Sequence, residues 1–435
     1  MPRHLLLASL LIGTACSAQP QQSGNQPVGI GNEGPGGTQA AAGDAMRGPQ
    51  GPQPAGASNP VPNDSPAYGI KKNVPATTGR ANLPESASPF AVTNIGQFEA
   101  PFAMAFLPDG GLLVTEKAGK LQLRLPGGAV FPTSGVPMVA HGGQGGLLGV
   151  AIAPDFATSH MLYLTYAEPR PNGGSSLALA RGVFRSAGDR ANPQLENLQV
   201  IWRAGSDGPG GQFGAKIAFA PDGKSLFLSS GERQRFAPAQ DPDQALGKII
   251  HLTLDGKPAP ENPEFAKGGA RAQTWSTGHR NPYGLLFTPD GRLWEEEMGP
   301  MGGDELNLIL PGRNYGWPIV SNGDNYSGKP IPDHPSRPDL EAPKLWWNPS
   351  ISPGGMIVYS GAMFPQYRGN LFIGALSGQA LIRVALSGDS AKAVDQWDMG
   401  TRIRDVAQAP DGSIWLLEDG GQGAQGHLMR LTPKT

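Results

Sequence analysis

Short apolar runs joined by a Pro-Asp turn recur along the chain. The clearest copies read AFLPDGGLLVTE, IAFAPDGKSLFLSSGE, LLFTPDGRLWEEE and VAQAPDGSIWLLED, and they begin at Ala105, Ile217, Leu285 and Val406. Each copy has two short apolar runs, and the Pro-Asp-Gly between them is a signal for a tight turn. The pattern therefore predicts a β-hairpin at each copy.

Two further copies, VAIAPDFATSHMLYLTY at Val150 and the degenerate IVYSGAMFPQYRGNLFIGAL at Ile357, raise the number of repeats to six. Their turns fall near residues 109, 155, 222, 290, 365 and 411. Repeats of this length built from short strands are typical of β-propeller blades, whereas the alternative, a β-sandwich, does not require similar hairpins. We predict an all-β fold, a six-bladed β-propeller, whose end strands near residues 90–95 and 427–432 close the ring in one shared blade.

Residues 1–18 have the layout of a secretory signal peptide. Arg3 and His4 precede an apolar run at 5–12, which is too short to span a bilayer as a permanent helix. A small residue before Cys16 resembles a bacterial lipoprotein cleavage site, and cleavage after Ala18 is the alternative. We expect a secreted, periplasmic or cell-envelope protein with no transmembrane span, and lipidation of Cys16 would anchor it to a membrane.

Residues 19–82 are rich in Gly, Pro, Gln and Ser and poor in large apolar side chains. Such a segment buries too little surface to offset its ordering entropy, so it is predicted to be a disordered spacer. The folded propeller domain is then expected over 83–435, where enough of the 38% hydrophobic residues lie to build a core.

Composition and charge exclude several classes of partner and site. The formal net charge is −2, which argues against binding to nucleic acid or to an anionic membrane surface. Cys16 is the only cysteine of the 435 residues, so neither a disulfide framework nor a cysteine metal site can form. Hydrolase interpretations are also disfavoured, because the chain has no nucleophile elbow, P-loop or HExxH motif.

The stretch from residue 277 to 318 holds the densest candidate chemistry. Arg280 and Asn281 precede a predicted hairpin, and an Arg there suits bidentate recognition of an anionic ligand. The alternative is that Arg280 only pairs with an acid such as Asp304. The carboxylates of residues 295–297 and 304–305, with the Gly299-Pro300 turn, supply the oxygen ligands that Ca²⁺ prefers. The alternative is a solvated acidic strand end.

Two other segments offer ligand-binding groups. Gln144 lies in the glycine-rich loop HGGQGG, where the backbone can approach a ligand closely, while His141 beside it is more often structural than catalytic. Arg402 and Arg404 are two residues apart, so in a strand both would face the same side and suit a ligand with several carboxylates. The alternative is that they are surface arginines.

Several ordered motifs resemble those of the soluble glucose and aldose sugar dehydrogenases that depend on pyrroloquinoline quinone (PQQ), also called glucose/sorbosone dehydrogenase-like proteins. The motifs are GGQGGLLG, TGHRNPYGLLFTPDGRL, EEMGPMGGDELNLILPGRNYGWP, NPSISPGG, FPQYRGNLFIGAL and TRIRDVAQAPDG, which together cover most of residues 90–435. The resemblance implies a six-bladed propeller that oxidises an aldose at the anomeric carbon by hydride transfer to PQQ. Ca²⁺ would act as a Lewis acid, and an external acceptor would take the electrons.

The resemblance also implies roles for individual residues. Those matching the family's quinone-binding positions are Gln144, Arg280, Asn281, Arg402, Arg404 and, more weakly, Tyr326. Arg280 would also stabilise the oxyanion that develops during the reaction. The positions matching Ca²⁺ ligands are Gly299 and Pro300, through their carbonyls, and Glu305 and Tyr315 for a second, structural ion.

The chain departs from the family pattern at two positions. Gln212 stands where the family has its general-base His, and a carboxamide has no useful proton affinity. Ser377 stands where some members have a cofactor-contacting Lys. Three hypotheses follow: a sugar dehydrogenase that is slow or uses a displaced base such as His141, a catalytically inactive quinone- or sugar-binding propeller, and, more remotely, a Ca²⁺-dependent lactonase.

Overall fold

The computed structural model describes residues 86–171, 173–186, 191–206, 208, 210–420 and 424–434, and the backbone of 67–69. The predicted signal peptide and, apart from 67–69, the predicted spacer lie outside these residues. Within the part of the chain that is described, no helix is long and apolar enough to cross a membrane.

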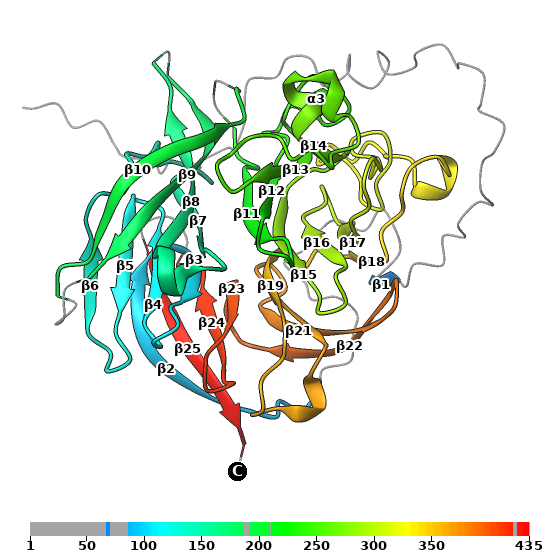
Figure 1. Cartoon of the computed structure of the whole chain (residues 1–435). Coiled ribbons are helices and arrows are strands. Elements are labelled where there is room, and N and C mark those ends of the chain that lie inside the picture. The colour runs from blue at the N-terminus through cyan, green and yellow to red at the C-terminus, as the bar shows by residue number, and fades with distance from the viewer. Residues whose placement is uncertain are drawn as a thin grey trace, which may run out of the picture. The chain divides into compact units, whose positions relative to one another are not determined.

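Six sheets make up the described fold, and each contains four antiparallel strands (Figure 1). In five of the sheets these strands follow one another along the chain. The first strands are β3 (Pro101–Phe106), β7 (Leu147–Ile152), β11 (Gly214–Phe219), β15 (Pro282–Phe287), β19 (Pro353–Val358) and β23 (Ile403–Gln408). The second strands are β4 (Leu112–Glu116), β8 (Met161–Pro169), β12 (Ser225–Ser230), β16 (Leu293–Glu297), β20 (Leu371–Ala375) and β24 (Ile414–Glu418).

The outer halves of the sheets are built from the remaining strands. The third strands are β5 (Lys120–Arg124), β9 (Ser175–Arg185), β13 (Lys248–Thr253), β17 (Asp304–Leu308), β21 (Ala380–Ser387) and β25 (Gln425–Pro433). The outermost strands are β6 (Val130–Thr133), β10 (Gln194–Arg203), β14 (Thr274–Thr277), β18 (Leu345–Asn348), β22 (Ser390–Asp398) and β2 (Phe90–Glu99). The sheet that ends at β18 gains a parallel strand, β1 (Ala67–Gly69).

Short helices occupy some of the connections. They are α2 (Phe156–Ser159), α3 (Gly269–Gln273) and the 3₁₀ helices η1 (Ala237–Ala239), η2 (Phe265–Lys267), η3 (His334–Ser336) and η4 (Pro365–Tyr367).

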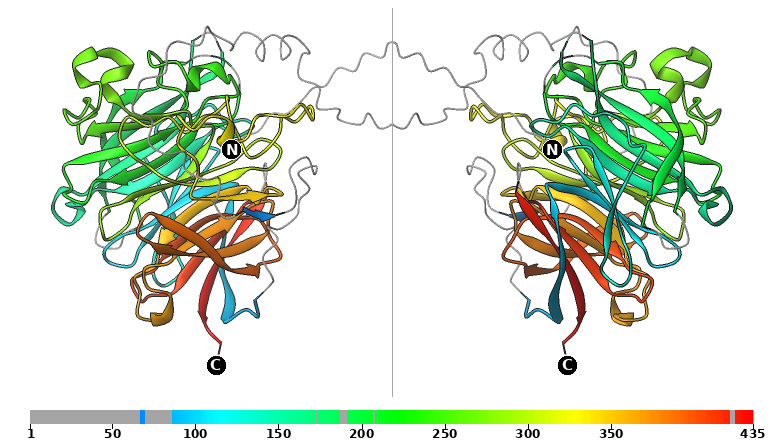
Figure 2. Two further views of the ribbon diagram at one scale, coloured as in Figure 1. Left: turned by 90° about the vertical axis from the view of Figure 1, so that its right-hand side faces the viewer. Right: turned by 90° about the vertical axis from the view of Figure 1, so that its left-hand side faces the viewer.

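The first strands form a closed ring. Each contacts the first strand of the next sheet, and β23 contacts β3, which confirms the predicted six-bladed β-propeller. Each predicted turn joins the first and second strands of one blade, as expected for a repeated hairpin. The last blade takes its outermost strand from the N-terminal side, because β2 pairs antiparallel with β25 from Phe90 opposite Pro433 to Glu99 opposite Gln425 (Figure 2). The predicted shared blade is therefore confirmed.

Apolar side chains fill the spaces between neighbouring blades. One buried cluster, for example, joins Met104 and Val114 of the first blade to Trp415 and Leu417 of the last. Removing such surface from water is the main favourable term in folding. This buried cluster therefore also stabilises the junction between the first and the last blade.

Each first strand also carries a register shift close to its beginning. A buried hydroxyl of the second strand satisfies the displaced backbone groups in three blades. In the second blade, Thr165 Oγ1 accepts from Gly149 N at 2.8 Å and donates to Ala215 O of the next blade at 2.7 Å. Thr115 and Ser229 make the corresponding pairs of bonds in the first and third blades.

Replacement of Thr165 by Val is expected to lower the free energy of unfolding by about 2–4 kcal/mol, because it leaves a buried N–H and a buried carbonyl without partners. Thr165→Ser keeps the hydroxyl and serves as the matched control. Urea unfolding of both variants would measure the difference. Equal destabilisation by Val and Ser would show that the hydroxyl does not hold the blades together.

Candidate functional site

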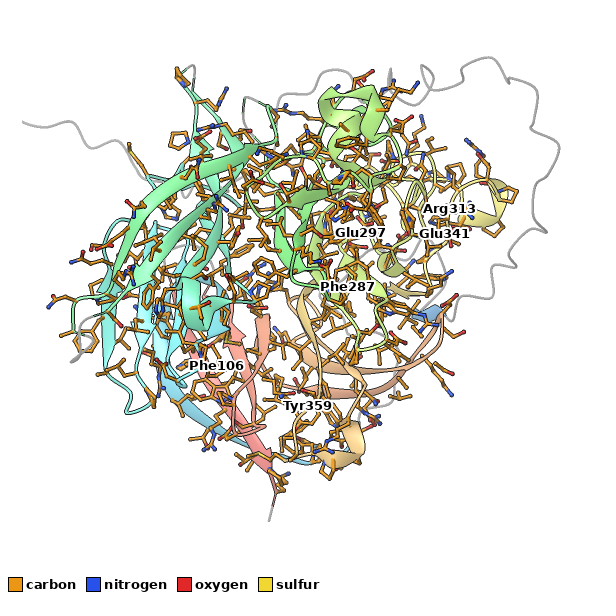
Figure 3. All side chains as sticks on the ribbon, in the orientation of Figure 1. Phe106, Phe287, Glu297, Arg313, Glu341 and Tyr359 are labelled. Carbon is orange, nitrogen blue, oxygen red and sulfur yellow. The ribbon has the colours of Figure 1, made fainter. Side chains whose placement is uncertain are left out.

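Propeller topology places the predicted site residues at one end of the ring. A first strand begins, and its antiparallel second strand ends, at the same end of a blade. In the blade of β15 and β16 these two points carry the HRNP and GPMGGDE segments, as predicted for this hairpin. Figure 3 labels Glu297 at this end of the hairpin and Phe287 at the other. Gln144, Gln212 and Arg402 likewise stand just before first strands.

Gln144 links three blades at this end. Its Oε1 accepts from Gln212 N at 2.6 Å and from the Tyr283 hydroxyl at 3.3 Å. The same loop borders an open pocket of about 530 Å³. The pocket is lined by residues 140–144 and by Gly174, Ser175, Gly210, Gly211, Phe213 and Gln234. His141 lies on the exposed part of this lining.

Gln212, which stands at the predicted base position, is buried, and its backbone is in the left-handed region at φ 53°. In the amide orientation that satisfies both neighbours, its nitrogen donates to Glu232 Oε1 and its oxygen accepts from Arg280 Nη2 at 2.8 Å. Burial raises the pKa of Glu232, although Arg280 and backbone N–H groups act in the opposite direction. Sequence reasoning missed Glu232, which lies in the loop after β12.

Arg280 is held by its own blade and by an aromatic loop. Nη1 donates to Met298 O at 2.8 Å, and Nη2 donates to the Tyr326 hydroxyl at 3.4 Å. The guanidinium also lies 5.2 Å from the centre of the Trp317 ring, and its buried Nε has no partner within the described chain. No ion pair to Asp304 forms between these described residues, so the alternative interpretation of Arg280 was wrong. Tyr326 is 73% exposed.

The loop that presents Arg280 and Asn281 is fixed by one carboxylate. Glu297 Oε2 accepts from the backbone N–H groups of Arg280 at 2.5 Å and Asn281 at 3.1 Å. The Asn281 side chain accepts from Gly214 N at 3.3 Å and so reaches the neighbouring blade. The predicted pair therefore projects from a rigid turn.

Arg402 and Arg404 face the same side, as predicted, and share one carboxylate. Arg402 Nε and Arg404 Nη2 lie 3.1 and 3.2 Å from Asp419 Oδ2. Burial opposes ionisation of Asp419, but Arg404 and Arg402 outweigh it and hold the pKa of this carboxyl below its usual value. The guanidinium of Arg404 lies 5.3 Å from the Phe102 ring, and its Nε is buried without a partner in the described residues.

Lys117 joins these arginines, and sequence reasoning missed it too. Its Nζ donates to Gly143 O at 3.3 Å, and burial together with Arg404 lowers its pKa. In the part of the site that the structure describes, Arg402 and Arg404 contact Asp419, and Lys117 lies near enough for the charges of Arg404 and Asp419 to affect its pKa. An excess of cations with unpartnered N–H groups fits a ligand that carries several carboxylates, such as PQQ.

The ligands predicted for two Ca²⁺ ions, Gly299 and Pro300 for the first and Glu305 and Tyr315 for the second, line the same small pocket, which also contacts Arg280. Its volume is about 10 Å³, room for one ion or water molecule. The Tyr315 hydroxyl donates to Leu308 O at 2.5 Å and accepts from Leu310 N at 2.9 Å, so only its backbone carbonyl is suited to bind a metal. A set of carbonyl and carboxylate oxygens fits Ca²⁺.

The buried carboxylate of Asp304 fixes the turn at Gly299 and Pro300 through hydrogen bonds. Its Oδ1 accepts from Gly299 N at 2.8 Å, and its Oδ2 accepts from the Ser350 hydroxyl and Ser352 N at 2.7 Å each. Burial raises the pKa of Asp304 to about 6. Ser377 donates to Ser350 O at 3.0 Å and so belongs to the same network rather than supplying a cation.

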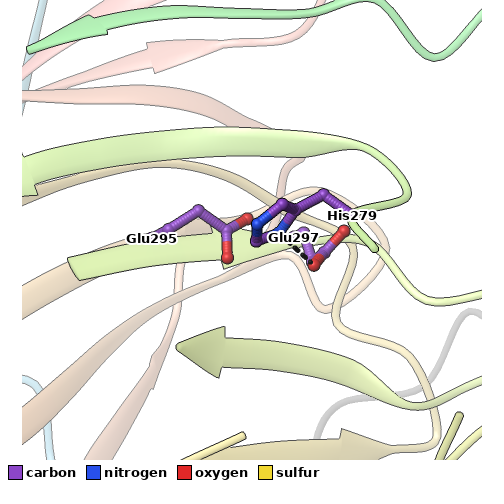
Figure 4. Close-up of side chains that lie close together, drawn as sticks. All are labelled: His279, Glu295 and Glu297. Atoms are coloured by element: carbon purple, nitrogen blue, oxygen red, sulfur yellow. Dashed lines mark hydrogen bonds and ion pairs between the residues drawn. The ribbon is translucent and has the colours of Figure 1, made fainter. Parts of the chain in front are cut away.

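The acidic end of β16 is buried rather than solvated, so that alternative was wrong. Glu295, Glu296 and Glu297 are at most 3% exposed. Glu295 and Glu297 lie on the face that carries His279 (Figure 4), whereas Glu296 points to the other face and contacts Gly284. Burial raises the pKa of Glu295 and of Glu296 well above the usual value.

Comparisons with known proteins agree with this architecture. The family model described as Glucose / Sorbosone dehydrogenase matches residues 98–430. The aldose sugar dehydrogenase YliI of Escherichia coli (strain K12) is 38% identical over 347 residues, which cover 78% of this chain and 91% of that protein. A crystal structure of a glucose dehydrogenase is 43% identical and covers 79% of this chain and 100% of its own, with a TM-score of 0.74.

A further solved relative was determined with its cofactor. The PQQ-bound form of the aldose sugar dehydrogenase of Streptomyces coelicolor is 27% identical and has a TM-score of 0.64. It covers 79% of this chain and 98% of its own. Together with the family match over nearly the whole propeller, these likenesses confirm the predicted family. This chain belongs to the glucose/sorbosone dehydrogenase family, and its relatives include oxidoreductases such as an aldose sugar dehydrogenase and a quinoprotein glucose dehydrogenase.

Proposed function

We propose that this protein oxidises aldose sugars at the anomeric carbon with PQQ and Ca²⁺ and passes the electrons to an external acceptor. The observation that carries this proposal is a group of cationic donors at one end of the propeller. Arg280 Nε and Arg404 Nε are buried without a partner among the described residues, and Lys117 Nζ makes one long hydrogen bond to Gly143 O. A lactone would not need so many cations, which disfavours the lactonase alternative.

Individual residues would divide the binding of the cofactor between them. Arg402, Arg404 and Lys117 suit its carboxylates, and Gln144 and Asn281 offer amide groups at the same end. The carbonyls of Gly299 and Pro300 suit the Ca²⁺ that assists PQQ, and the carboxylate of Glu305 with the carbonyl of Tyr315 suits the second, structural Ca²⁺. Bound PQQ would supply the hydride acceptor, and Ca²⁺ would supply Lewis-acid polarisation.

Arg280 is suited to stabilise negative charge that develops on an oxygen. Its guanidinium is anchored by Met298 O on one side and Tyr326 on the other, so it need not reorganise during the reaction. Preorganised donors of this kind often make the largest contribution to rate enhancement.

The site lacks an evident group to accept the proton that the sugar loses during oxidation. Gln212 occupies the base position and its amide is shared between Glu232 and Arg280, so it orients groups but accepts no proton. Glu232 is the carboxylate closest to this position among the described residues, and its pKa is raised by burial. This observation favours an alternative function: a propeller that binds the quinone or a sugar without rapid turnover.

Reconstitution with PQQ and Ca²⁺ tests both functions. We expect about one PQQ to bind per chain, measured by absorbance after gel filtration, and aldose-dependent reduction of an artificial dye. Chelation of Ca²⁺ should abolish the dye reduction. Binding without dye reduction would support the non-catalytic alternative, and failure to bind PQQ would overturn the cofactor assignment, and with it the enzyme function and the quinone-binding alternative.

The cellular location is a separate proposal. The signal-like residues 1–18 support export to the periplasm or cell envelope. Mass spectrometry of the mature protein would show an acylated Cys16 if the chain is anchored, or a start at Gln19 if it is cleaved after Ala18. An intact Met1 in the mature protein would contradict export.

A further inference from the structure

Blade four, formed by β15 to β18, buries four neighbouring polar side chains, the polar square, which consists of Glu295, Glu297, Glu305 and Asn307. In the antiparallel register of β16 and β17, Glu295 lies opposite Asn307 and Glu297 lies opposite Glu305. Side chains two residues apart in a strand share a face, so all of them project from one face of this sheet. Like charges directly opposite one another destabilise a sheet, and here Glu297 faces Glu305.

Little positive charge balances this square. Glu295, Glu297 and Glu305 are 0%, 3% and 7% exposed. Within the described residues their ion-pair partners are two histidines, His279 for Glu297 and His334 for Glu305. Burying charge is costly unless it is paired or binds a metal, so the square requires protons or a cation.

Two buried oxygens in the square have no partner. Asn307 Nδ2 lies 3.0, 3.4 and 3.2 Å from oxygens of Glu295, Glu297 and Glu305. An NH₂ group has only two hydrogens and cannot satisfy all three carboxylates. Glu295 Oε1 and Asn307 Oδ1 make no hydrogen bond to any described group.

His279 adds a nitrogen donor to these oxygens. The ring is fully buried, and its Nδ1 lies 3.2 Å from Glu297 Oε1. Its Nε2 lies 2.8 Å from Ser276 Oγ, and the ring stacks on Tyr315 with centroids 4.7 Å apart, so both contacts fix its orientation. A hydrogen bond from the second nitrogen is the usual support for a metal-binding histidine.

We propose that this cluster binds one divalent transition-metal ion, for which Zn²⁺ is the appropriate probe, through His279 Nδ1, Glu295 and Glu297. Donor atoms of these residues lie within 4.8 Å of one another (Figure 4). Metal–ligand distances of about 2.0–2.2 Å place donors a little over 3 Å apart, so small side-chain rotations would suffice. Rotation of the Asn307 amide by a half turn would add its unpartnered Oδ1.

The donor set distinguishes this ion from the proposed Ca²⁺. Ca²⁺ prefers oxygen ligands throughout, whereas imidazole with carboxylates suits Zn²⁺ and its neighbours in the first transition row. The proposed Ca²⁺ donors Gly299 and Pro300 belong to the turn beyond β16, and Glu305, although it faces Glu297 across the sheet, is not one of the three ligands proposed for this ion. The ion would be structural, because Glu297 Oε2 at the same time holds the N–H groups of Arg280 and Asn281.

This proposal can be tested by measuring the metal content of the full-length protein, with no PQQ added. Because the cluster is buried, the protein should be produced, or unfolded and refolded, with Zn²⁺ present and then washed with a weak chelator. Elemental analysis should find about one Zn²⁺ per chain in the wild type and almost none in Glu295→Gln, which preserves side-chain volume. Glu261→Gln, a change at an exposed acid, is the matched control and should retain the ion.

Refolding with Co²⁺ gives an independent readout, because a nitrogen- and oxygen-ligated Co²⁺ absorbs visible light. The band should be present in the wild type and in Glu261→Gln and absent in Glu295→Gln. Wild-type protein without Zn²⁺ or Co²⁺, a Glu295→Gln protein that keeps the ion, or displacement of the ion by Ca²⁺ would each overturn the proposal. None of these outcomes bears on PQQ binding, so they leave the proposed function to its own test.

Discussion

Replacing Arg280 by methionine is expected to lower kcat/KM for aldose oxidation by the protein reconstituted with PQQ and Ca²⁺ by about 10²–10³-fold, the usual cost of removing one preorganised donor to a developing oxyanion. Methionine keeps an unbranched apolar side chain between Met298 and Tyr326 but removes every N–H donor of the guanidinium. The loss should fall mainly on kcat if Arg280 acts in the transition state. Dye-linked kinetics over a range of aldose concentrations would separate kcat from KM.

The matched control is Arg292→Met. Arg292 lies at the turn of the same hairpin, at the end away from the site, where it pairs with Asp290 and Asp389. Such exposed pairs contribute little, so its activity should stay within about twofold of the wild type. An Arg280→Met protein that binds PQQ and keeps full kcat would refute the assigned role.

The blade pattern was predictable because it depends on local rules. The Pro-Asp-Gly turns at residues 108–110, 221–223, 289–291 and 410–412 join first and second strands, and alternation within a hairpin needs no distant information. Ring closure by β2 and β25 was also predicted, because six hairpin repeats indicate six blades and the two end strands were left to complete one of them. The hairpin also fixed which segments share an end, which is why Arg280 and Gly299 were correctly expected together.

Long-range partners were not predictable in this way. Lys117 of the first blade approaches Gly143 of the second only because neighbouring blades bring their loops together. Glu232 and Gln212, by contrast, flank one hairpin, β11–β12, whose pairing could have placed them together. The burial of Glu295 and Glu297 was missed because three consecutive acids at a strand end usually mark an exposed edge. In the structure, β17 pairs beside β16, and the stacked rings of His279 and Tyr315 lie next to the acids, so this end of the strand is covered.

Replacing Gln212 by histidine is expected to raise kcat/KM by about 10²–10⁴-fold, the usual contribution of a positioned general base. The imidazole would take the place of an amide that now lies between Glu232 and Arg280, so Glu232 would hold its N–H and leave the other nitrogen to accept the proton. The gain should disappear as the pH falls below about 6.5, the ordinary pKa of histidine, because only neutral imidazole is a base. A pH profile of dye-linked kinetics, beside the wild type, would measure this.

Two further variants identify what produces the gain. Gln212→Asn changes the size of the side chain without adding a base, so its kcat/KM should not exceed that of the wild type. Glu232→Gln in the histidine variant should remove part of the increase, because a neutral amide holds the imidazole less firmly than a carboxylate. If Gln212→His and the wild type are equally fast, another group accepts the proton; loss of wild-type activity in Glu232→Gln, with PQQ binding intact, would identify Glu232 as that group.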